Sequence, residues 1–171
     1  MERLVPLGET PIPDVPFTHL ARFVINNARE FGGLPLEGKI DDDAHVGTEH
    51  LLLSLALHPN IVKIIVSSGI PVGELVSDLA DYVKDDPNTP ETDDQGFTFT
   101  VVQALNNARI LANKDNSQVT TTHMYAGLIE AGRGKALMTL GRFLGYPEDD
   151  PAATPFIQDA LFEHIPSMRR E

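Results

Sequence analysis

The sequence predicts an all-α fold made of two tandem four-helix repeats related by pseudo-twofold symmetry. Apolar residues recur at intervals of three and four along several segments, which is the period of an amphipathic helix. No segment shows the period-two alternation of a β-strand over any useful length. Short landmarks also occur twice, in the same order, in the two halves of the chain, which indicates an internal duplication.

The duplication rests on pairs of matching segments. Residues 17–18 (Phe-Thr) recur at 97–98, and residues 26–29 (Asn-Asn-Ala-Arg) recur at 106–109, both 80 positions later. Residues 46–50 (Val-Gly-Thr-Glu-His) then correspond to 119–123 (Val-Thr-Thr-Thr-His), and Gly69 corresponds to Gly145. The changes in spacing are explained by loops of different length, the longer one lying between Arg29 and Thr48.

The first helix of the first copy begins near Phe17 and ends at Gly32-Gly33. Thr18 is its expected N-cap, because a threonine hydroxyl can accept a backbone N–H of the first turn. A loop over residues 34–46 follows and carries an acidic run at 41–43. The apolar face of the helix consists of Phe17, Leu20, Ala21, Val24, Ile25 and Ala28.

The second helix begins at Thr48 and is apolar almost all round, so we expect it at the buried centre of its repeat. Residues 58–60 (His-Pro-Asn) end it. A third helix covers about residues 61–68 and stops at Gly69, since glycine favours the left-handed conformation that follows many helices. Pro71 opens the fourth helix.

The second copy repeats this order. Thr100 and Gln103 also fit a capping box, which would start its first helix two residues later than the repeat implies. The expected helices cover residues 97–113, 122–131, 134–144 and 154–163.

These elements divide the chain into an N-terminal tail (1–16), repeat 1 (17–84), an acidic linker (85–96), repeat 2 (97–163) and a C-terminal tail (164–171). The linker is rich in Pro and Asp, a composition typical of a loop. The expected core residues are Leu20, Val24, Leu52, Leu55, Ile65, Leu79, Val101, Leu105, Leu128, Leu137 and Leu144.

Composition excludes several function classes. The 171-residue chain has no cysteine, which rules out disulfides, thiol nucleophiles and cysteine metal sites. A formal net charge of −12 disfavours nucleic acid and anionic membranes as partners. No apolar run is long enough to span a bilayer, and the N-terminus lacks the pattern of a secretory signal, so we expect a cytoplasmic protein.

No motif argues for an enzyme. Residues 127–132 begin like a phosphate-binding loop, but Arg133 and Gly134 stand where Lys and Ser or Thr are required. A nucleophile elbow of the Gly-x-Ser-x-Gly type is also absent. We therefore expect a non-catalytic chain that needs no cofactor.

The segment 47–53 (Gly-Thr-Glu-His-Leu-Leu-Leu) resembles the second-helix signature of the N-terminal domain of the Clp unfoldases, especially the ClpC and ClpA branch. The resemblance extends over about residues 17–163 and is that of a stand-alone Clp N-domain. It implies two four-helix repeats and a non-catalytic role in a chaperone and proteolysis system. The implied partners are client proteins, adaptors or Clp ATPase and protease subunits.

The resemblance also implies candidate binding residues. In the ClpC branch the signature glutamate is associated with phosphoarginine recognition, which would place Glu49 against a guanidinium and Gly47-Thr48 against the phosphate. The second copy offers Thr121 and Thr122 there, and a threonine cannot pair with a guanidinium as a carboxylate does. The alternative for Glu49 is an acidic residue that complements the positive end of its helix.

Three further candidates have structural and functional interpretations. His50 and His123 recur at equivalent positions; buried histidines that donate to a carbonyl are expected, and no metal site, because the spacing of a known metal motif is absent. A group formed by residues 41–43 with His45, Glu49 and His50 is expected to be a solvated loop. Phe17 and Phe97 are expected core anchors, or they flank a groove between the repeats that would bind a small cyclic peptide.

Overall fold

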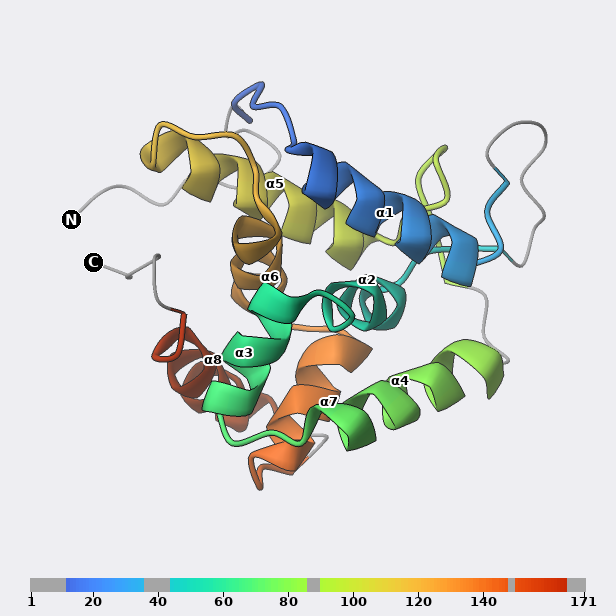
Figure 1. Ribbon diagram of the computed structural model, residues 1–171. Coiled ribbons are helices and arrows are strands. Elements are labelled where there is room, and N and C mark those ends of the chain that lie inside the picture. Colours follow the sequence, from blue (N-terminus) through green and yellow to red (C-terminus); the bar gives the residue numbers. More distant parts are fainter. Residues whose placement is uncertain (1–11, 36–43, 86–89, 148–149, 166–171) are drawn as a thin grey trace.

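The computed structural model describes residues 12–35, 44–85, 90–147 and 150–165 (Figure 1). These residues form eight α-helices and one short 3₁₀ turn, with isolated backbone bridges but no β-strand, so the predicted all-α class is confirmed. The elements are α1 (His19–Phe31), α2 (Thr48–Leu55), α3 (Pro59–Ser67), α4 (Val72–Asp85), α5 (Phe99–Lys114), α6 (Thr121–Glu130), α7 (Lys135–Phe143), η1 (Pro151–Ala153) and α8 (Thr154–Phe162).

Equivalent threonines start the first helix of each repeat. The Thr18 hydroxyl accepts the Ala21 N–H at 3.1 Å and caps α1, as the sequence predicts. The Thr98 hydroxyl accepts the Val101 N–H at 3.4 Å and caps α5. The later start at Thr100 is therefore wrong, because the repeated threonine already satisfies a first-turn donor.

Helix α2 is the centre of the molecule, as its all-round apolar sequence predicts. All of its residues are buried, and it packs against α1, α4, α5, α6 and α7 (Figure 1). None of the described helices is by itself long and apolar enough to cross a membrane; α2 and α3 would qualify together, but they are bent by 102°.

The predicted core is largely confirmed, with two corrections. Nine of the eleven expected residues are buried, Val24, Leu52 and Leu79 among them with no exposed surface. Leu20 is 44% exposed, because α1 turns it away from α2, and Leu144 is half-buried beyond the end of α7. Of the expected linker and tails, residues 1–11, 86–89 and 166–171 lie outside the described part of the chain.

The two repeats exchange backbone hydrogen bonds reciprocally. Thr18 N–H donates to the Val119 carbonyl at 2.9 Å, and Val119 N–H donates to the Pro16 carbonyl at 2.9 Å. The equivalent bonds join Thr98 N–H to the Val46 carbonyl at 3.0 Å and Val46 N–H to the Gly96 carbonyl at 2.8 Å. The segment before the first helix of each repeat thus pairs with the segment before the second helix of the other, as pseudo-twofold symmetry requires.

The second helix of each repeat also contacts the third helix of the other repeat. Thr48, the first residue of α2, accepts the Ala136 N–H of α7 at 3.2 Å, while Thr121, the first residue of α6, accepts the Asn60 side-chain amide of α3 at 2.6 Å. Gly134 makes the first contact possible. A Cβ there would lie 2.6 Å from the Thr48 hydroxyl oxygen, and its φ of +104° also favours glycine.

We expect Gly134→Ala to lower the free energy of unfolding by about 3 kcal/mol, because the substitution combines backbone strain with a clash between the repeats. Gly145→Ala is the comparison: φ is +94° there, but nothing lies within 4 Å of an added Cβ, so we expect a cost of about 1–2 kcal/mol. Urea denaturation measures both. Equal costs would contradict the close inter-repeat contact at Gly134.

Candidate binding site between the repeats

Three helices from the two repeats begin around one cavity. The amino-terminal ends of α2, α5 and α7 surround a space of about 260 Å³. Helix starts carry a partial positive charge and N–H groups without a partner in the helix, although Thr48 takes the Ala136 N–H of α7 and Thr98 takes the Val101 N–H of α5. Their convergence favours a ligand with anionic groups. The cavity is lined by His45, Gly47, Thr48, Glu49, Pro90, Thr98, Thr100, Gly134 and Lys135.

Glu49 is buried at 4% exposure because Gly47 leaves room for it. A Cβ at position 47 would overlap the Glu49 carboxylate, so the carboxylate occupies the place where an N-cap side chain would begin. In the second repeat an N-cap side chain takes this place instead of a carboxylate. Its N-cap is Thr120, whose hydroxyl accepts the His123 N–H at 3.2 Å, and the residue equivalent to Glu49 is the smaller Thr122.

The Glu49 carboxylate forms an ion pair across the repeat interface. Its Oε2 lies 3.6 Å from Nζ of Lys135, the first residue of α7. The lysine side chain is 34% exposed, and its ammonium also lies 5.8 Å from the centre of the Tyr82 ring on α4. A negative and a positive group therefore stand side by side at the wall of the cavity.

The two equivalent histidines cap their helices. His50 Nδ1 accepts the Gly47 N–H at 2.9 Å, and His123 Nδ1 accepts the Thr120 N–H at 3.0 Å. Both are buried as predicted, and in both Nδ1 accepts a backbone N–H. The prediction of a donated bond to a carbonyl is wrong for His123, whose other ring nitrogen meets a carboxylate. The proton of neutral His123 therefore sits on Nε2, which donates to the Asp115 carboxylate at 2.8 Å.

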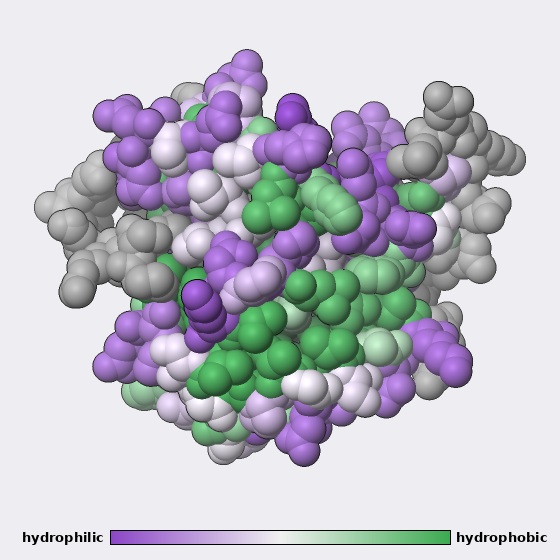
Figure 2. Space-filling view, viewed as in Figure 1, coloured by the Kyte–Doolittle hydropathy of each residue, from purple (hydrophilic) through white to green (hydrophobic). Residues whose placement is uncertain are grey.

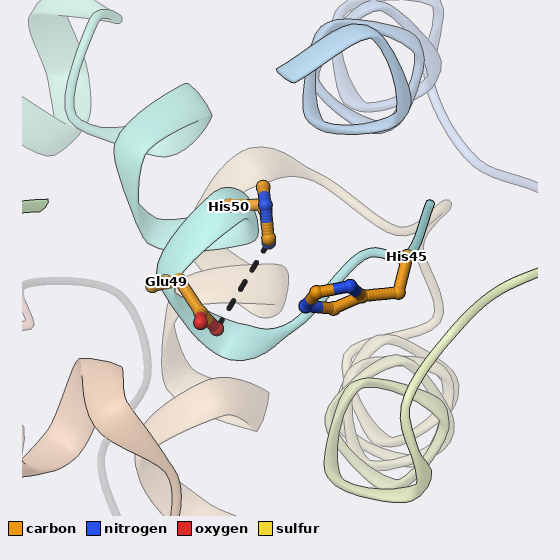
Figure 3. A group of neighbouring side chains, drawn as sticks. All are labelled: His45, Glu49 and His50. Atoms are coloured by element: carbon orange, nitrogen blue, oxygen red, sulfur yellow. Dashed lines mark ion pairs between the residues drawn. The ribbon is translucent and has the colours of Figure 1, made fainter. Parts of the chain in front are cut away.

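His45, Glu49 and His50 converge near the start of α2 (Figure 3). Each offers one possible ligand atom, and these atoms lie within 4.8 Å of one another. Two of the possible ligand atoms are already engaged, because His50 Nδ1 accepts the capping N–H and the Lys135 ammonium faces the Glu49 carboxylate. Residues 41–43, which the sequence groups with this trio, lie outside the described part of the chain.

The equivalent place in the second repeat carries no charged pair. Thr122 replaces Glu49, and Pro59, the first residue of α3, replaces Lys135. Thr121 is 2% exposed, and its hydroxyl is engaged by Asn60. Of these two homologous helix starts, as far as the described residues go, the one at Glu49 alone combines a buried carboxylate with an ammonium.

Phe17 and Phe97 lie at the two inter-repeat bridges rather than on the wall of this cavity. The Arg109 guanidinium lies 5.0 Å from the centre of the Phe17 ring, and that of Arg29 lies 5.7 Å from the centre of the Phe97 ring. Phe97 is only 8% exposed. Each ring is thus covered by the arginine of the other repeat, which supports the interpretation as core anchors.

Sequence reasoning missed Lys135 and Gly134, although it singled out Gly47, Thr48 and Glu49, which the structure brings together. Both missed residues come from the opposite repeat, about 86 positions away along the chain. A signal was present in the alignment of the repeats, because Lys135 and Pro59 occupy equivalent positions and differ in charge.

Comparison with known families decides what this fold is. Residues 16–143 match the family model described as the Clp repeat (R) N-terminal domain, which covers most of the chain. The chain belongs to the Clp repeat N-terminal domain family. The match includes every residue that lines the cavity, so the inter-repeat site of this Clp repeat domain lies within the family's own fold.

A solved structure has the same fold as this Clp repeat domain. It is the N-terminal domain of ClpD, a chaperone associated with the caseinolytic protease of Arabidopsis thaliana. The TM-score is 0.57 and the sequence identity is 20%; the match covers 93% of this chain and 99% of the ClpD domain. At this identity the likeness concerns the fold alone. A search of curated proteins finds no match.

We expect Gly47→Ala to push the Glu49 carboxylate out of its buried position and to cost about 1–3 kcal/mol of unfolding free energy. In a Glu49→Ala background the atoms nearest to the added methyl group are gone, so its cost should fall to below about 0.5 kcal/mol. Chemical denaturation of the two single variants and the double variant measures this coupling. Additive effects would show that position 47 does not hold the carboxylate.

Proposed function

We propose that this Clp repeat domain is a docking module that holds client proteins, adaptors or Clp ATPase and protease subunits and performs no chemistry itself. Family membership over residues 16–143 is the observation that carries the proposal. The composition of the cavity also supports it, because the titratable side chains on its wall are committed to structure. Glu49 and Lys135 form an ion pair, and His45 packs edge-on against His50 with 5.1 Å between the ring centres. The cytoplasmic location expected from the sequence belongs to the same proposal.

Affinity purification from a native lysate of the source organism tests this function. We expect Clp ATPase or protease subunits to be enriched on the immobilised domain relative to an unrelated acidic helical protein of similar charge, which controls for non-specific attraction. Enrichment of Clp components by both proteins, or by neither, would contradict the assignment.

We further propose that the cavity at Glu49 is the ligand site, and that phosphoarginine in a peptide is the chemistry it fits best. A carboxylate pairs well with a guanidinium, while Thr48, Lys135 and the N–H groups at the starts of α2 and α7 would face the phosphate. On binding, Glu49 would pair with the guanidinium and Lys135 with the phosphate in place of each other, so neither charge would be left buried without a partner. Thr121 and Thr122 would not form a second site, because neither they nor Pro59 supplies a charge.

Isothermal titration with a phosphoarginine peptide tests the site. We expect one binding site per chain, loss of binding in Glu49→Ala, and unchanged binding in Thr122→Ala, which alters the equivalent position in the other repeat. The arginine form of the peptide should bind at least about tenfold more weakly, because the phosphate contacts are lost. Retained affinity in Glu49→Ala, or two sites per chain, would refute this assignment.

The inter-repeat groove at Phe17 and Phe97 is a less favoured ligand site. Arg109 and Arg29 cover both rings, so a small cyclic peptide would have to displace them before it could reach either phenylalanine. A thermal-shift screen with cyclic peptides tests this alternative, because a ligand that binds only the folded state raises the melting temperature of the protein.

A further inference from the structure

One face of the first repeat exposes apolar side chains that its own core does not use. On α1, Leu20 is 44% exposed and Phe23 is 47% exposed; in the turn between α2 and α3, Leu57 is 52% exposed. The Phe23 ring packs edge-on against His58, with 6.0 Å between the ring centres, which brings α1 beside this turn. Figure 2 shows a small group of apolar side chains at the height of α1 and a larger apolar area below it on the same face. Leu20, Phe23 and Leu57 are called the apolar patch below.

The second repeat is an internal control for these positions. The residues equivalent to Leu20, Phe23 and Leu57 are Thr100, Gln103 and Arg133, which are polar at every place. The same helices form and pack in both repeats. Folding therefore does not require apolar side chains at these positions. An exposed group of apolar residues that packing does not need indicates a surface for a partner.

The charges around the apolar patch differ from those of the whole chain. Arg22 on α1 and Lys63 on α3 are exposed, and the described residues of these two helices contain one acidic residue, Glu30. The chain as a whole carries a formal charge of −12. Helices α1 and α3 together carry three basic residues, Arg22, Arg29 and Lys63, against the one acidic residue. This positive balance on an acidic protein favours a partner that brings carboxylates and disfavours a second copy of this chain.

We propose that the apolar patch docks an amphipathic helix of a partner protein that carries carboxylates beside its apolar stripe. Leu20 and Phe23 stand one helical turn apart and form a ridge against which a partner helix can pack, and Leu57 supplies a third anchor from the neighbouring turn. Arg22 and Lys63 would meet the carboxylates at the rim. This inference rests on the proposed docking function but uses a different surface from the cavity at Glu49.

Fluorescence anisotropy with a labelled model peptide tests the proposal. The probe is an amphipathic helix of about 18 residues with leucines at helical spacing and glutamates on either side; its counterpart has lysines instead. We expect the glutamate peptide to bind at least about tenfold more tightly than the lysine peptide at low salt, and addition of salt to reduce the difference.

A double variant with the residues of the second repeat, Leu20→Thr and Phe23→Gln, should weaken binding of the glutamate peptide at least about tenfold. Its melting temperature should stay close to that of the unchanged chain, because both side chains are exposed and the second repeat accepts these residues. Phe156→Gln on α8, which removes a 62% exposed phenylalanine from another surface, is the matched control and should bind as before.

Equal affinity for the two peptides, or equal loss in the double variant and Phe156→Gln, would overturn the proposal. Self-association that depends on the apolar patch, measured by sedimentation velocity, would also overturn the proposal, because the partner would then be a second copy of this chain. Binding to vesicles of phosphatidylserine and phosphatidylcholine that depends on the patch would overturn it as well, because the partner would then be a membrane. Failure of the Clp proteins to co-purify while the glutamate peptide still binds would reject the proposed cellular function but keep this surface. Glu49→Ala should leave peptide binding unchanged.

Discussion

The pairing of the two repeats through four backbone hydrogen bonds is the constraint on which the rest of the molecule depends. The bonds at Thr18, Val119, Thr98 and Val46 fix the segment that precedes a helix of one repeat against the segment that precedes a helix of the other. Buried backbone donors need such partners, because leaving them unpaired away from water is costly. The pairing at Val46 and Thr98 sets the start of α2 beside the start of α5, and the contact of Thr48 with Ala136 adds the start of α7. The cavity lies where these three helices begin.

The two repeats have the same framework but carry different side chains at equivalent positions of the interface. Each repeat presents the start of its second helix to the third helix of the other, but one presentation carries Glu49 and Lys135 and the other carries Thr122 and Pro59. The exposed face of the first helix differs in the same way, with Leu20 and Phe23 in one copy and polar residues in the other. A duplicated fold can therefore support two surfaces of different chemistry without a change in its framework.

Much of the fold could be predicted from local patterns. The Thr18 cap, the buried α2 and the helix class each depend on residues close together in the chain, so capping chemistry, apolar content and helical period reveal them. The prediction that Leu20 lies in the core is wrong, because helical period cannot say which edge of an apolar face meets a neighbour. Lys135 could not be placed at the site, since its contact with Glu49 depends on the packing of the two repeats. The direction of the histidine hydrogen bonds likewise depends on caps that only the coordinates define.

Native-state hydrogen exchange at the four bridging amides tests most directly whether the repeats form one cooperative unit. If the pairing holds them together, the amides of Thr18, Val46, Thr98 and Val119 should exchange only through global unfolding, with the same free energy as buried amides of α2 and α6. Exchange of Val46 and Thr98 through a partial opening that leaves either α2 or α6 protected would show that the halves open separately, which would contradict this account.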